Sequence, residues 1–105
     1  MSNEELLQQA ISQVIPADHL AMNGQREAGA VYRSAGERQI YESDTLLMTQ
    51  EIFQIYVYQM EYDPEIVSAV RTAGIDAGFS VVMGGQIMEG EYYRDELRFS
   101  KRKED

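Results

Sequence analysis

The sequence predicts an α+β fold in which two helices pack on one face of a small mixed, mainly antiparallel sheet. Three observations indicate this class. An amphipathic helical pattern opens the chain and stops at Pro16; strand-like residues 49–60 lead into a helix start at Asp63-Pro64; two further strand-like runs close the chain. The expected order is α-β-(β)-β-α-β-β, with an α/β-like strand–helix–strand unit that can join parallel strands.

A chain of 105 residues is expected to form one domain, residues 1–105. We expect an N-terminal helix at 2–15, the sheet and second helix within 28–100, and a frayed charged tail at 101–105. The absence of cysteine excludes disulfides, thiolate metal sites and thiol nucleophiles. The first residues lack a signal peptide pattern and no apolar run approaches the roughly 20 residues that span a membrane, so we expect synthesis in the cytoplasm and no membrane partner.

The formal net charge is −9, from 18 acidic and 9 basic residues. The acids are spread along the chain: residues 1–52 hold 8 acids and 3 bases, and residues 53–105 hold 10 acids and 6 bases. This distribution is typical of general solubility. Because binding to phosphates needs a basic surface, the charge argues against nucleic acid as a specific partner.

Residues 2–15 carry the signals of an amphipathic helix. Ser2 and Glu5 form a capping-box pattern, and Pro16 follows the last residue of the helical period. The apolar face holds Leu7, Ala10, Ile11 and Val14.

The segment after this helix is harder to interpret. Residues 17–27 show no clear period. We expect a short strand at 28–33, a polar loop at 34–38 and a brief edge strand at Ile40 and Tyr41.

Residues 49–60 form the clearest strand, because both of its faces carry apolar residues. One face holds Phe53, Ile55 and Val57; the other holds Ile52, Gln54, Tyr56, Tyr58 and Met60. A helix follows, with Asp63 as its cap and Gly78 just past its end. Gly74 inside it is expected to weaken the helix by about 1 kcal/mol relative to Ala.

Two strands are expected at the C-terminus. The first, residues 79–83, is broken by Gly84-Gly85, which favours a hairpin bend, and residues 86–91 are expected to form a loop. The second covers residues 92–101, where Asp95 interrupts an apolar face and is expected near a strand end. That face holds Tyr93, Leu97 and Phe99.

No group of residues indicates catalysis, a cofactor or a metal ion, so we expect a protein that is not an enzyme. His19 is the only histidine, and beside Asp18 on a loop it is better explained as exposed than as half of a catalytic dyad. Paired acids also lack the spacing of a calcium loop; they are Glu89 with Glu91 and Asp95 with Glu96. A carboxylate enzyme using Asp18, His19, Glu89 and Glu91 ranks last among the alternatives.

Tyrosine is frequent, with seven residues in a chain of this size. Most should cover the core of the sheet, but tyrosine and methionine are also favoured at protein–protein contacts. The second face of strand 49–60 is the best candidate for such a contact. The expected interface residues are Tyr56, Tyr58, Met60, Tyr41 and Met88.

This order of elements resembles the small tail-completion proteins of bacteriophages and prophages, called tail terminator, head–tail joining or minor tail proteins. The resemblance covers residues 28–100 as an architecture; the proline-rich entry common in such proteins is replaced here by residues 24–29. The segments that carry it are Val31-Tyr32-Arg33, residues 53–58, residues 62–66, Ala77-Gly78-Phe79 and residues 91–99.

The resemblance implies a structural protein of the virion, without enzymatic activity or cofactor. Such a protein would form a homo-oligomeric ring, expected to be hexameric, that caps the tail tube and connects it to the head. Residues 34–44 and 84–91 would be loops that reach neighbouring subunits. The alternative is a small acidic binding or regulatory module, similar to an immunity or inhibitor protein, that acts by protein–protein contact.

Overall fold

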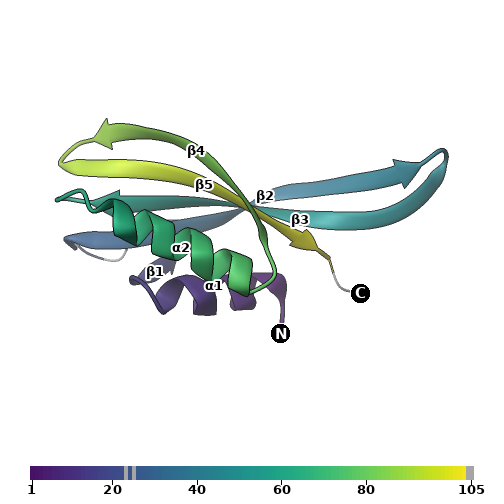
Figure 1. Cartoon of the computed structure of the whole chain (residues 1–105), viewed down its shortest axis with the longest axis horizontal. Coiled ribbons are helices and arrows are strands. Elements are labelled where there is room, and N and C mark those ends of the chain that lie inside the picture. Colours follow the sequence, from purple (N-terminus) through teal and green to yellow (C-terminus); the bar gives the residue numbers. More distant parts are fainter. Residues whose placement is uncertain (23, 25, 104–105) are drawn as a thin grey trace.

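The computed structural model describes residues 1–22, 24 and 26–103 (Figure 1). Within them the chain forms two helices and one five-stranded sheet with the strand order β1-β2-β3-β5-β4. Strands β1 and β2 are parallel and the other neighbouring strands are antiparallel, which confirms the α+β class and the mixed sheet. The elements are α1 (Asn3–Ser12), β1 (Ala17–His19), β2 (Ala28–Glu42), β3 (Thr45–Gln59), α2 (Pro64–Asp76), β4 (Ser80–Glu89) and β5 (Tyr92–Arg102).

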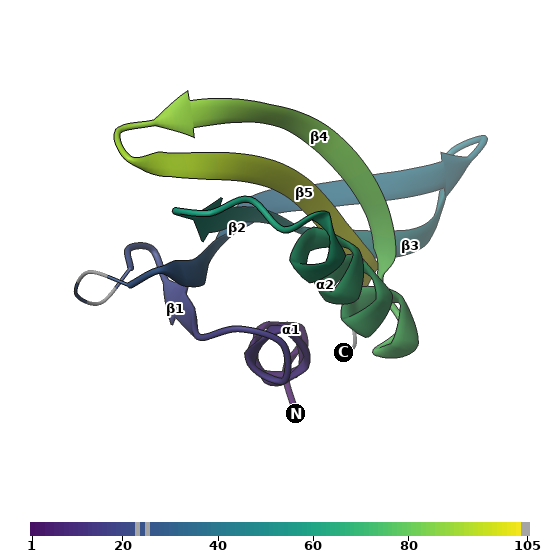
Figure 2. The same ribbon diagram turned by 60° about the vertical axis from the view of Figure 1, so that its left-hand side comes forward.

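Both helices lie on the same side of the sheet, as predicted (Figure 2). The apolar faces of α1 and α2 pack onto the inward-facing residues of β2, β3 and β5, and together they form one core. The predicted inward residues Phe53, Ile55 and Val57 are among its most buried members. We call the uncovered side of the sheet the open face.

Both helix starts and the end of α2 follow their capping signals, whereas α1 ends at Ser12, earlier than the expected end at residue 15. Ser2 and Glu5 form the capping box, with the Ser2 hydroxyl accepting from the Glu5 amide at 3.1 Å. Asp63 caps α2 by accepting from the Glu65 amide at 2.9 Å. At the other end Gly78 has φ +95°, and the Phe79 amide donates to the Gly74 carbonyl, so the helix closes with a Schellman motif.

Strand β2 corrects the prediction of a strand, a loop and an edge strand at 28–41. It is one strand that pairs with β3 along its length, and a β-bulge between Ser34 and Glu37 absorbs the extra residue. The polar residues were mistaken for a loop because both faces of the strand are exposed there, which removes the hydrophobic alternation. Strand β3 likewise begins at Thr45, earlier than expected.

The far ends of β2 and β3 form an arm. We define the arm as residues 39–49, where the two strands pair in the sheet only with each other, since the pairing of β3 with β5 begins at Gln50. The arm projects well past both helices (Figure 1) and makes the molecule 48 Å long against 26 and 22 Å.

Strand β4 corrects the prediction of a bend and a loop at 84–91. It continues to Glu89, and Gly84 and Gly85 form a bulge opposite the single residue Glu96 of β5. A Cβ at Gly84 would lie 3.0 Å from Glu96 atoms, so the close approach of the two strands favours glycine there. The turn instead falls at Gly90, which has φ +61°.

Asp95 is the fourth residue of β5, near the strand start as expected, and its buried side chain accepts from the Gln86 side chain. Two further expectations were wrong in detail. The unpatterned segment after α1 contains β1, which is too short to show a period. The tail is ordered as strand through Arg102, and the Lys103 amide donates to the Thr49 carbonyl at 2.7 Å; residues 104 and 105 lie outside the described residues.

Candidate interaction surfaces

The open face carries a cluster of aromatic side chains over β3 and β5. The Tyr56 and Tyr58 rings lie 6.5 Å apart, and the Tyr92 ring meets Tyr58 edge-on at 5.8 Å. The Arg94 guanidinium lies 4.5 Å from the centre of the Tyr56 ring, a cation–π contact that holds the ring in place. These side chains are half-buried, so the cluster offers a rigid surface that is still accessible.

The same cluster borders a hollow of about 510 Å³ whose other wall is the segment after β1. Burial and a hydrogen bond with Glu89 raise the pKa of Tyr58 above its ordinary value. The Tyr92 hydroxyl donates to the Arg26 carbonyl at 2.7 Å and ties β5 to that segment. The raised pKa of Tyr58 keeps this residue of the hollow protonated at neutral pH.

Arginines flank this cluster in two rows across the open face. Gln54 of β3 has Arg33 of β2 on one side and Arg98 of β5 on the other. Gln50 is flanked in the same way; its neighbours are Arg38 and Arg102. All four arginines are exposed.

Side-chain hydrogen bonds join Arg33 and Gln54 of the first row to Glu96 of β5. Arg33 Nε donates to Gln54 Oε1 at 2.9 Å, and Gln54 Nε2 donates to Glu96 Oε1 at 2.5 Å. The sequence pattern placed Arg94 and Arg98 on one face of the last strand, because an even spacing keeps residues on one face, but it did not indicate that Arg33 and Arg38 lie in line with Arg98 and Arg102.

The outer edge of the sheet is strand β4, which exposes four large apolar side chains: Val82, Met83, Ile87 and Met88. Neither lysine nor proline interrupts this strand. Natural edge strands are usually blunted by such residues, because an unpaired apolar edge promotes association with another chain. Strand β4 is therefore a second candidate contact surface.

The predicted interface residues fall in three separate regions. Tyr56 and Tyr58 share the open face, and Met60 lies just past the end of β3. Met88 lies on the edge strand β4, while Tyr41 lies in the arm at the other end of the molecule. These five residues do not form one continuous patch, and whether they contact a partner stays a prediction.

The helices bound a groove of about 580 Å³ on the opposite side of the molecule. Small side chains of α2 such as Ala69 and Ala73 form its floor. Glu65 and Asp76, near the two ends of α2, also line it. The groove is therefore acidic at both ends.

The residues considered for catalysis do not gather in one place. Asp18 pairs with Arg26 at 2.6 Å, whereas His19 Nε2 lies 3.3 Å from Glu4 Oε1 and its ring packs on Tyr32. His19 belongs to β1 rather than to a loop. Within residues 1–22, 24 and 26–103, no three histidine or acidic side chains converge to hold a metal ion.

Neither helix of the described chain is long and apolar enough to cross a membrane. In comparisons with known proteins, no family model matches the chain and no curated protein matches it. The surfaces described above therefore provide the basis for a functional proposal.

Proposed function

We propose that the chain is a structural subunit of a bacteriophage or prophage virion, a tail terminator or head–tail joining protein. It forms a homo-oligomeric ring at the end of the tail tube and connects the tube to the head. Its partners are copies of itself, the tail tube protein and the head connector. It is made in the bacterial cytoplasm, acts in the virion and catalyses no reaction.

The arm is the observation that carries this proposal. A two-stranded ribbon without a covering layer is marginally stable in water. Three of the apolar side chains of the arm are nonetheless half-exposed: Tyr41, Leu46 and Leu47. Such a projection is explained when its apolar side chains are covered by a neighbouring subunit.

The placement of the contact surfaces favours a ring over a symmetric dimer. The arm and the exposed edge of β4 belong to different parts of the molecule, so the arm of one subunit meets a different surface on the next. A contact between two different patches is heterologous, and it closes into a ring when the rotation between subunits allows.

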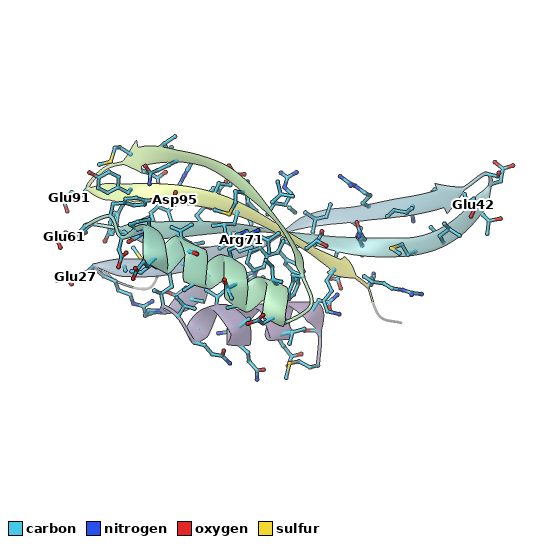
Figure 3. All side chains as sticks on the ribbon, in the orientation of Figure 1. Glu27, Glu42, Glu61, Arg71, Glu91 and Asp95 are labelled. Carbon is cyan, nitrogen blue, oxygen red and sulfur yellow. The ribbon has the colours of Figure 1, made fainter. Side chains whose placement is uncertain are left out.

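The ends of the molecule also disfavour a simple end-to-end filament. Figure 3 places Glu42 at the tip of the arm and Glu27, Glu61 and Glu91 at the opposite end of the molecule. Since both ends are acidic, they repel each other. The arm is therefore expected to lie along a neighbour rather than to meet its far end.

The test is assembly of the purified chain, alone and with preassembled tail tubes. We expect rings in negative-stain electron microscopy and a discrete oligomer by light scattering, in at least the sample with tubes. A version whose arm is shortened to a tight Asn-Gly turn should keep its circular dichroism spectrum and lose the rings. A strict monomer at high concentration, with tubes present, would contradict the proposal.

Gene order provides an independent check. Capsid, tail-tube and tape-measure genes beside this reading frame are expected under the proposal. Metabolic or ribosomal neighbours would argue against a virion protein.

The net charge of −9 favours the second candidate, a small acidic binding or regulatory module that blocks a basic partner. This candidate predicts a stable monomer in every assembly test. It also predicts that a basic protein partner binds with an affinity that falls steeply as salt is raised.

A further inference from the structure

Positive charge in this acidic protein is concentrated on one surface. Five of the nine basic residues lie on the open face of β2 and β5: Arg33, Arg38, Arg94, Arg98 and Arg102. The helical side has the opposite sign. The two helices carry Glu4 and Glu5 on α1 and Glu65 and Asp76 on α2, and Arg71 is the only base within them; Lys101 of β5 reaches this side near Gly78. The even spread of acids along the sequence hides this separation in space.

Among the described residues, four of these arginines have no ion-pair partner. Arg94 is paired with Glu89 at 3.3 Å, whereas Arg33, Arg38, Arg98 and Arg102 make no ion pair within the part of the chain that the structure describes. In a chain with twice as many acids as bases, four exposed and unpaired arginines on one face are unexpected. They provide guanidinium groups for a partner with an anionic surface.

On the helical side, Asp76 lies where a negative charge is unfavourable. It lies in the last turn of α2, where the partial negative charge of the helix end disfavours an acid, and that turn contains no base. Lys101 of β5 reaches this end, with its side chain 3.3 Å from the Cβ position of Gly78, and a second cation from a neighbouring subunit would relieve the repulsion further. Asp76 and Glu65 thus place a negative charge at each end of the groove between the helices, where a cationic side chain of a partner can bind.

We propose that the arginine rows of the open face bind the acidic helical side of a second copy of this chain, with Arg98 and Arg102 directed at Glu65 and Asp76. The two arginines are roughly 13 Å apart along β5, and the two acids are roughly 16 Å apart along α2. Arginine side chains are long and flexible enough to cover that difference. This inference deepens the proposed ring and rests on it, since it names the two faces that meet between neighbouring subunits.

The rest of the open face fits a protein better than a nucleic acid. The rows lie beside half-buried apolar and aromatic residues such as Ile52 and Tyr56, which provide the apolar part of a protein interface. Glu89 and Glu96 share the surface and would repel a phosphate backbone. The net charge of −9 opposes the approach of a polyanion from any distance.

The test uses two charge-reversal variants and their mixture. The sheet variant is Arg98→Glu with Arg102→Glu, and the helix variant is Glu65→Arg with Asp76→Arg. Alone, each variant presents like charges on both faces, so its self-association should weaken by roughly 10-fold or more. An equimolar mixture restores opposite charges at every contact, so it should assemble as the unmodified chain does.

Sedimentation velocity and electron microscopy, with tail tubes where the unmodified chain needs them, provide the readout. Arg71→Glu is the control: it makes the same change in net charge as Arg98→Glu, yet it should not weaken assembly, because Arg71 lies on the acidic side. Circular dichroism establishes that every variant is folded.

Each outcome supports or overturns the inference. Rings of undiminished stability from the sheet variant, or a mixture that fails to assemble, would overturn it while the proposed ring stands. A monomeric unmodified chain in all conditions would overturn both. Binding of a fluorescein-labelled DNA duplex by the unmodified chain, lost in the sheet variant and not recovered in the mixture, would assign the arginines to nucleic acid instead.

Discussion

The two halves of strand β3 both carry large apolar residues, but these residues lie in opposite environments. In the half that lies under the helices, Phe53 and Ile55 are 2% and 0% exposed. In the half that belongs to the arm, Leu46 and Leu47 are 47% and 50% exposed. The same strand thus carries apolar residues that hold the fold together and apolar residues that have no cover within their own chain.

We call the part of the molecule outside the arm the body. The difference in exposure indicates that apolar residues of the body stabilise the fold, whereas those of the arm serve association. The body is stabilised by burial of apolar area in a shared core, so its residues should control the free energy of unfolding. The arm contributes little buried area, so its residues should control association. Substitutions in the two regions test this separation.

The largest loss is expected for Phe53→Ala in the body half of β3. The Phe53 ring is nearly inaccessible and meets Phe79 edge-on at 6.3 Å. Its removal leaves a cavity and should lower the free energy of unfolding by about 3–5 kcal/mol. Urea denaturation followed by circular dichroism measures it; a loss below about 1 kcal/mol would mean that the core does not support the strand as described.

A smaller loss is expected for Gly74→Ala in α2. Helix propensity alone favours alanine by about 1 kcal/mol. A Cβ at this position would, however, lie 2.3 Å from Cε2 of the buried Phe99, so the helix would have to shift away from the sheet. Overpacking typically costs 1–3 kcal/mol, and we expect a net loss of about 1–2 kcal/mol.

Gly85→Ala is the matched control, because a Cβ there meets no heavy atom within 4 Å. Its effect on the free energy of unfolding should stay within about 0.5 kcal/mol. A Gly74→Ala variant that is more stable than the unmodified chain would show that the Phe99 ring moves aside at little cost.

Gly74 also shows where sequence reasoning stops. Local rules located both helix starts and the Gly78 end correctly, because caps depend on neighbouring residues alone. The same rules made Gly74 a weak point of the helix. Glycine fits at position 74 because the Phe99 ring of β5 leaves no room for a Cβ, and this contact depends on tertiary packing.

The open parts of the sheet were harder to predict for a related reason. Alternation of apolar and polar residues indicates a strand when one face of the strand is buried and the other is exposed to solvent. The arm is exposed on both faces, and β4 is exposed along nearly its full length, so neither shows a clean alternation. Tyr56 and Tyr58 were placed on this face by the alternation of strand 49–60, whereas the alignment of the arginines into rows needed the register of β2, β3 and β5.

A loss of about 1 kcal/mol is expected for Asp63→Ala at the start of α2. The Asp63 carboxylate accepts from the Glu65 amide, and its own amide donates to the buried Gln59 side chain at 2.8 Å. The substitution removes the first hydrogen bond and keeps the second, so the loss should be that of an N-cap alone. Asp63→Asn retains an acceptor and should recover most of it in the same urea titration.

The smallest effect on stability is expected for Leu47→Ser together with Leu46→Ser at the end of the arm. Both side chains are half-exposed and outside the core, so the free energy of unfolding should change by about 0.5 kcal/mol or less. Ring formation should nevertheless be lost, because the arm would no longer present apolar surface to its neighbour. In this arm variant, electron microscopy should show the loss of rings while urea titration shows a nearly unchanged free energy of unfolding. In Phe53→Ala, both the free energy of unfolding and ring formation should decrease. An arm variant that unfolds as readily as Phe53→Ala would show that the arm belongs to the folding unit, and rings that survive the substitution would remove the arm from the subunit contact.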